Sequence, residues 1–111
     1  MWLLDHNVPV QLRGLLVEYG LEVETVVARG WQALRNGDLV VTASGEGFRA
    51  LLTRDSRFAE AARSALDQLP EFALVVIGIP QRRWRLYEVE VRRAWSIKKI
   101  DPLPGEVIQW P

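Results

Sequence analysis

Two aspartates in this chain each follow a short apolar run, and each run is followed by a helical pattern. Asp5 comes after Leu3–Leu4, and Asp55 comes soon after the stretch Ala50–Thr53. Such runs indicate buried strands, and open α/β sheets place their chemistry just beyond the carboxyl ends of the strands. Two carboxylates side by side repel each other unless a positive charge lies between them, so the pair predicts a cation site.

A third aspartate, Asp38, lies in the first turn of a predicted helix that leads into the strand before Asp55, although a helix in such a fold can begin at either edge of the sheet. Three converging carboxylates suit Mg²⁺ or Mn²⁺, because these cations prefer oxygen ligands and keep several waters. Such a metal activates a bound water and neutralises charge on a phosphodiester. The candidate catalytic and metal-binding residues are therefore Asp5, Asp38 and Asp55, and the chemistry is hydrolysis of a nucleic-acid backbone. Asp55 taken alone is equally well interpreted as a helix cap, and the lone histidine, His6, is left out of the site.

Five polar residues near these acids are candidates for supporting the site. Asn7 and Thr53 could orient metal-bound water, and Glu60 could supply a further carboxylate. Arg57 could bind a phosphate through two guanidinium nitrogens, and Arg54 is a further candidate for supporting the site. Each has an ordinary interpretation as well. Asn7 could cap a helix, Thr53 could pack within its strand, and the two arginines could simply compensate the acidic charge.

The elements that must position these residues alternate between strand and helix. Apolar or β-branched segments predict strands at 2–5, 21–27, 50–55, 72–79 and 106–110. Helical spacing predicts one helix between a cap at Asn7 and Gly20, one from 36–38 to before 47, one over 59–66, and one that carries Trp84 and Trp95. This alternation predicts a single domain over residues 1–111, with an α/β layered fold, a mainly parallel sheet and right-handed crossovers.

Basic residues gather in the last third of the chain, although its fourteen basic and fourteen acidic residues cancel overall. Arg82, Arg83 and Arg85 could follow a phosphate backbone of RNA, and two tryptophans of the same segment could stack on bases. The alternative, which we favour, is a solvated helix with its apolar stripe in the core. Five tryptophans are many for 111 residues, and exposed ones would suit an interface with a second copy or a protein partner.

The composition also bounds the compartment. The chain has no cysteine, which excludes disulfides and thiolate metal sites. It shows no basic segment of a signal peptide, and no apolar run approaches the roughly 20 residues that a membrane span needs. We therefore expect a cytoplasmic protein.

Three segments in this order and spacing resemble the bacterial PIN-like domains of the DUF5615 type, relatives of the PIN-domain ribonucleases. The segments are LLDHNVP at 3–9, GDL at 37–39 and LTRDSRF at 52–58, and the resemblance covers about the first two-thirds of the chain. It implies an α/β/α sandwich, acidic residues that bind Mg²⁺ or Mn²⁺, and single-stranded RNA as substrate. The implied function is a metal-dependent endoribonuclease, often the toxin that is paired with an antitoxin protein.

One residue departs from the family pattern. Related sequences often carry a second aspartate two positions after the first, and this chain has Arg57 there. The change alters the local charge by about two units and would weaken a second metal. A second hypothesis is therefore a catalytically impaired PIN-like module that binds RNA or a protein partner without cleavage. A signalling receiver domain is disfavoured, because the last predicted strand, 106–110, has no lysine and His6 follows Asp5.

Overall fold

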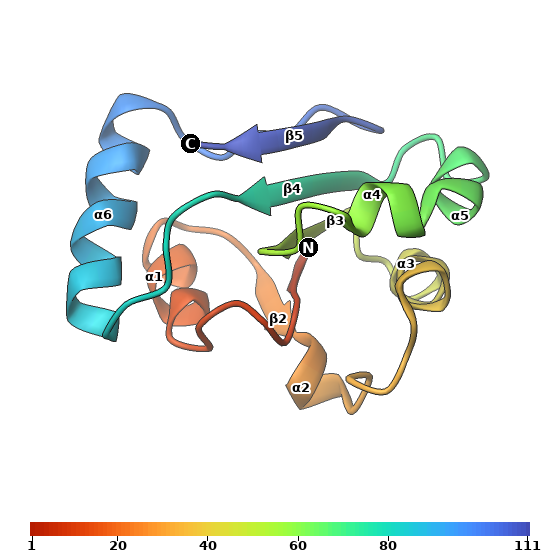
Figure 1. Cartoon of the computed structure of the whole chain (residues 1–111), viewed down its shortest axis with the longest axis horizontal. Helices are drawn as coiled ribbons and strands as arrows, with labels where there is room; N and C mark the ends of the chain where they lie inside the picture. The colour runs from red at the N-terminus through yellow and green to blue at the C-terminus, as the bar shows by residue number, and fades with distance from the viewer.

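Five strands form one sheet in the computed structural model, which describes residues 1–111 (Figure 1). They are β1 (Trp2–Leu4), β2 (Val23–Thr25), β3 (Ala50–Thr53), β4 (Ala73–Ile77) and β5 (Val107–Trp110). They lie in the order β2-β1-β3-β4-β5, and every pairing is parallel, which confirms the predicted parallel sheet. From β1 the chain adds β2 on one side and then β3, β4 and β5 on the other, so the direction of strand addition reverses between β1 and β3. Open α/β sheets bind ligands beyond the carboxyl ends of the strands at such a point.

Side chains of the central strands are buried on both faces of the sheet. Leu3 lies opposite Leu51 in the register of β1 and β3, and Leu4 lies opposite Leu52. The first pair faces one side of the sheet and the second pair faces the other, and all four side chains are buried. Burial of each of these leucine side chains contributes about 1.5–3 kcal/mol to the free energy of folding. The two strands that carry the candidate aspartates are therefore held from both sides.

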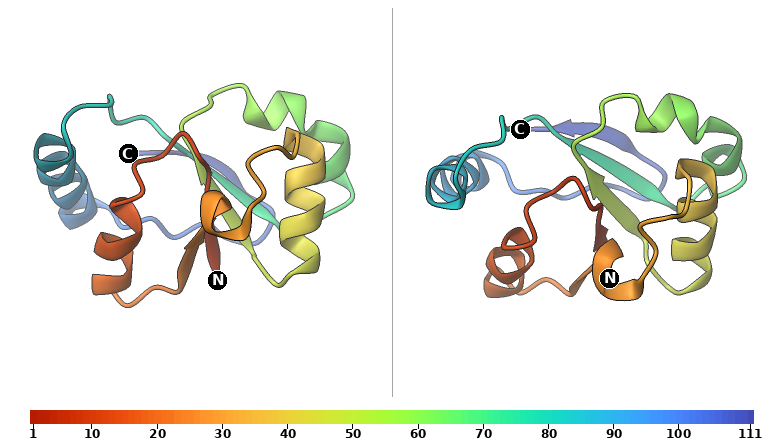
Figure 2. Two further views of the ribbon diagram at one scale, coloured as in Figure 1. Left: turned by 90° about the horizontal axis from the view of Figure 1, so that it is seen from below. Right: turned by 60° about the horizontal axis from the view of Figure 1, so that its bottom comes forward.

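Helices cover both faces, so the fold is an α/β/α sandwich, as predicted (Figure 2). One layer contains α1 (Leu12–Glu18) and α6 (Trp84–Ile97), which pack on the face of Leu4 and Leu52. The other layer packs on the face of Leu3 and Leu51. It contains α2 (Val26–Arg29), α3 (Asn36–Gly45), α4 (Phe58–Ala61) and α5 (Arg63–Asp67).

The connection from β4 to β5 differs in hand from the other three. The chain passes from β1 to β2 through the layer of α1, and then moves the opposite way, to β3 and β4, through the other layer. It continues in that same direction to β5 but passes through α6, in the layer of α1. Because these hands differ, the prediction that all crossovers are right-handed is wrong for at least one of them. The layer beside α1 offers α6 an apolar surface, while α3, α4 and α5 occupy the other face.

Three predicted boundaries are corrected. The first helix begins at Leu12 rather than after a cap at Asn7, whose side chain is used elsewhere. Val26 and Val27, predicted as strand, belong to α2, because Thr25 Oγ1 accepts a hydrogen bond from the Ala28 N–H at 3.0 Å and caps a helix there. The predicted helix over 59–66 is divided into α4 and α5.

The helix predicted around Trp84 and Trp95 is confirmed as α6. Tyr87 and Val91 are fully buried against the sheet, and both tryptophans pack partly buried beside them. This is the core-facing stripe that we favoured from the sequence. None of the helices, α6 included, combines the length and the apolar character that crossing a membrane requires.

Candidate functional site

A pocket of about 380 Å³ lies at the carboxyl edge of the sheet, where the strand order reverses. Its wall is built from the ends of β1, β2, β3 and β4 and the loops that follow them. The lining residues are Asp5, His6, Asn7, Val8, Pro9, Val10, Thr25, Val27, Arg54 and Gln81. Three residues predicted for the site, Asp5, Asn7 and Arg54, thus line a single pocket.

Asp5 is the buried acid of this pocket, with 5% of its surface exposed. Its Oδ2 accepts a hydrogen bond from the Thr53 hydroxyl at 2.8 Å. Its Oδ1 accepts one from the His6 backbone N–H at 2.8 Å and lies 3.0 Å from His6 Nδ1. Donors to both oxygens compensate the cost of burying the carboxylate and fix its orientation.

Thr53 connects the loop after β1 to the loop after β3. Its fully buried hydroxyl donates to Asp5 and accepts from the Asp55 backbone N–H at 3.1 Å and from Asn7 Nδ2 at 3.3 Å. Asn7 Oδ1 in turn accepts from the Arg54 backbone N–H at 3.1 Å. Of the two residues predicted to support the site, Thr53 therefore contacts Asp5 directly, whereas Asn7 contacts Thr53 and the Arg54 backbone.

Asp55 lies next to the pocket rather than in its wall. Its Oδ1 accepts a hydrogen bond from the Arg57 backbone N–H at 2.9 Å, which forms the turn that leads into α4. This bond agrees with the helix-cap interpretation. It engages one carboxylate oxygen, and Oδ2 has no hydrogen bond from the chain. Asp5 and Asp55 thus follow the neighbouring strands β1 and β3, and the Thr53 hydroxyl bonds to the Asp5 carboxylate and to the Asp55 backbone N–H.

The third predicted acid is not joined to this pair. Asp38 is exposed in the first turn of α3 and has no hydrogen bond or ion pair to Asp5 or Asp55. No group of three His, Cys, Asp or Glu side chains in the structure could hold a metal ion. Glu60 and Arg57 are exposed, and neither side chain forms an ion pair. The three-carboxylate site therefore stays a prediction: of its members only Asp5 lines the pocket, and Asp55 follows the neighbouring strand β3.

Arg54 brings a positive charge to the pocket wall. Its Nη1 donates to Gln81 Oε1, while its Nε is buried without a partner. The Tyr87 hydroxyl is also buried without a partner, and burial raises the pKa of this phenol, an effect that the charge of Arg54 opposes. Gln81 was not among the predicted site residues, although its position in the loop that follows β4 could have indicated it.

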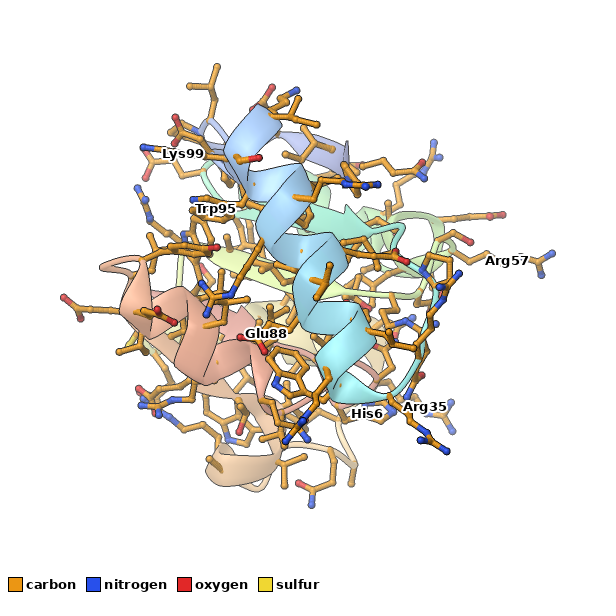
Figure 3. All side chains as sticks on the ribbon, turned by 90° about the vertical axis from the view of Figure 1, so that its left-hand side faces the viewer. His6, Arg35, Arg57, Glu88, Trp95 and Lys99 are labelled. Atoms are coloured by element: carbon orange, nitrogen blue, oxygen red, sulfur yellow. The ribbon has the colours of Figure 1, made fainter.

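The three arginines predicted for RNA lie where α6 begins, at the carboxyl edge of the sheet. Arg82 pairs with Glu90 at 3.3 Å, whereas Arg83 and Arg85 are exposed without an ion pair. His6, Arg35 and Arg57 lie along the same side of the molecule in Figure 3, and Lys99 lies at the far end of α6. Arg54 is the one arginine that lines the pocket, and its charge suits an anionic ligand there.

The donor set fits one hydrated Mg²⁺ or Mn²⁺. Mg²⁺ is usually bound through one or two carboxylates, with waters and substrate phosphates as the other ligands. A carboxylate offers about four acceptor sites, so Asp5, with three polar contacts, and Asp55, with one, retain free capacity. These two residues would hold the ion.

Comparisons of the chain with protein-family models, with curated proteins and with solved structures find no match.

Proposed function

We propose that this protein is a metal-dependent endoribonuclease that hydrolyses single-stranded RNA, with Asp5 and Asp55 as the residues that hold Mg²⁺ or Mn²⁺. The observation that carries the proposal is that the Thr53 hydroxyl joins the Asp5 carboxylate to the backbone N–H of Asp55, and that these two acids follow the neighbouring strands β1 and β3. They lie at the point of an open parallel sheet where ligands bind. The resemblance to PIN-like domains extends the proposal to RNA and to a toxin that is paired with an antitoxin.

Asp5, Asp55 and Arg54 each have a defined part in this proposal. Asp5 supplies a preorganised oxygen ligand, because its position is set by Thr53 and His6. Asp55 supplies its free Oδ2. Arg54 would bind the phosphate whose ester bond is cleaved, since its guanidinium lines the pocket beside Asp5. When bound, the ion would lower the pKa of a water and neutralise charge that develops on the phosphate.

A second candidate is a catalytically impaired module that binds RNA or a protein without cleaving. It is favoured by the absence of a three-carboxylate group and by the exposed Arg57 that follows Asp55. Arg57→Asp would restore the missing carboxylate. If the impaired module is the correct account, this variant should gain Mn²⁺ affinity and RNA cleavage that the unmodified protein lacks.

Calorimetric titration with Mn²⁺ tests the metal site directly. The unmodified protein should bind Mn²⁺, and Asp55→Asn should weaken binding by at least about tenfold, because it removes a charged ligand. Asp67→Asn, at an exposed position of α5, is the matched control and should bind as the unmodified protein does. Absence of binding in the unmodified protein would favour the impaired module.

Cleavage of a fluorescently labelled single-stranded RNA in Mn²⁺ then tests the reaction. Asp55→Asn should abolish cleavage, and Asp67→Asn should leave it unchanged. Asp38→Asn decides between the two forms of the site, since full activity in this variant would limit the ligands to Asp5 and Asp55. Cleavage that survives in Asp55→Asn would refute the proposal.

A further inference from the structure

The outer side of α6 carries a second apolar stripe. Leu86, Val89 and Ile97 are 54%, 64% and 81% exposed. At 3.6 residues per turn they lie within one narrow sector of the helix, on the side away from Tyr87 and Val91. Those two are fully buried against the sheet, so the fold already uses the other stripe of this amphipathic helix. Figure 3 views the molecule from the side on which α6 lies in front of the other elements.

Basic side chains accompany this stripe. Arg93 lies in the same sector, between Val89 and Ile97 along the helix, and Arg85 lies at its flank. Both are exposed, and neither forms an ion pair in the structure. Two further cations, Lys98 and Lys99, follow the end of α6.

The acids of α6 do not neutralise these cations. Glu88 Oε2 lies 2.9 Å from Arg92 Nη2, and Glu90 pairs with Arg82 at 3.3 Å. Arg92 also pairs with Glu18 of α1 at 3.0 Å. Both glutamates are thus engaged within the chain, and the outer surface of the helix stays apolar and positive.

We propose that the outer face of α6, formed by Leu86, Val89, Arg93 and Ile97 with Arg85 at its flank, docks an acidic amphipathic helix of another protein. The apolar residues would pack against the apolar side of that helix, and the arginines would pair with carboxylates at its margins. The 14 residues of α6 span about 21 Å, so the partner helix needs about four turns to cover the face. This inference does not rest on the proposed function.

Charge complementarity separates this partner from a second copy of the chain. Packing the outer face of α6 on the same face of a second copy would bring Arg93 and Arg85 near their own counterparts, and like charges at an interface are repulsive. A partner with carboxylates at these positions turns the same contacts into attractive pairs.

The chemistry of the face also disfavours RNA and lipid. Nucleobases stack on aromatic rings, and the outer face has none. The two tryptophans of α6 are engaged inside, Trp95 stacked on Tyr19 at 4.6 Å between ring centroids and Trp84 tilted against Tyr87 at 5.9 Å. Helices that lie on membranes use Trp, Phe and Leu as anchors, whereas this stripe is short and interrupted by Arg93.

Selection from a displayed library of helical peptides tests the inference. With a library of about 16-residue peptides, long enough for four turns, the enriched sequences should be acidic and should carry apolar residues at helical spacing. The tightest selected peptide is then synthesised with a fluorophore, and its binding is measured by anisotropy. Val89→Glu should weaken binding by at least about tenfold, because it buries a charge opposite carboxylates. Arg93→Glu should weaken it for the same electrostatic reason.

The matched control is Val41→Glu, the same substitution at an exposed position of another helix. Val41 is 53% exposed on α3, in the opposite layer, so this variant should bind the peptide as the unmodified protein does. If the peptide binds Val89→Glu and Val41→Glu with equal affinity, the proposal is overturned. Enrichment of basic or uncharged peptides in the selection would also overturn it. The proposal is also overturned if the library yields no binder and the protein instead binds single-stranded RNA or vesicles of anionic phospholipid, with an affinity that Val89→Glu lowers.

Discussion

Replacing Thr53 by valine should destabilise the protein by about 2–3 kcal/mol, although the two side chains have nearly the same shape. The buried hydroxyl of Thr53 donates to Asp5 Oδ2 at 2.8 Å and accepts from the Asp55 N–H at 3.1 Å. A hydrogen bond to a charged group contributes about 1.5–3 kcal/mol, and the N–H that loses its acceptor adds about 1 kcal/mol. The methyl group of valine returns about 0.8 kcal/mol through burial, which leaves the stated net loss.

Urea unfolding, followed by circular dichroism, measures this loss. For a domain of this size the expected decrease corresponds to about 10 °C in the melting temperature. Thr42→Val is the matched control, because the Thr42 side chain, on α3, takes part in no hydrogen bond. It should change the free energy of unfolding by less than about 0.5 kcal/mol. If Thr53→Val proves as stable as Thr42→Val, the hydroxyl does not hold Asp5 in its buried position, and our account of the site is refuted.

Two further predictions concern pH. Burial raises the pKa of Tyr87 above 10.0, so the unfolded chain loses the phenol proton at a lower pH than the folded protein does. The free energy of unfolding should therefore decrease as the pH rises above about 10. Urea unfolding of Tyr87→Phe should show a smaller decrease over this pH range. Hydrogen bonds from Arg29, at 2.8 and 2.9 Å, hold the pKa of Glu24 below 4.5. The pair therefore stabilises the folded protein above that pH, and this stabilisation is lost as the pH falls through the lowered pKa. Arg29→Ala should therefore lower the melting temperature at neutral pH and lessen its decrease in acid, and an unchanged acid profile would contradict this.

Elements whose signal is local were predictable from the sequence. The continuous apolar runs of β1, β3 and β4 fix which residues are buried, since a strand covered on both faces must be apolar on both. The spacing of Trp84, Tyr87, Val91 and Trp95 predicted α6 for a similar reason, because the inward side of a helix repeats at fixed intervals. The neighbouring parallel strands that precede Asp5 and Asp55 were also predictable, because both runs are short, apolar and followed by a helix.

What failed depends on partners that lie far away in the chain. Asn7 has the residue type of a helix cap, but its side chain bonds to Thr53 and to the Arg54 backbone, 46 and 47 residues away. The hand of the last crossover depends on which face the other helices leave open, and that is a property of the assembled layers. The position of Asp38 relative to Asp5 likewise depends on how α3 is packed, which the pattern of α3 alone does not specify.

The placement of α6 beside α1 has a consequence for synthesis on the ribosome. Glu18 and Arg92, which join the two helices, are 74 residues apart, an interval that takes about 4–15 s to translate at 5–20 residues per second. During this interval the buried cluster that Tyr87 and Val91 of α6 complete, to which Leu4 and Leu52 also belong, lacks that helix. The nascent chain is therefore open to aggregation or chaperone binding until its last quarter emerges.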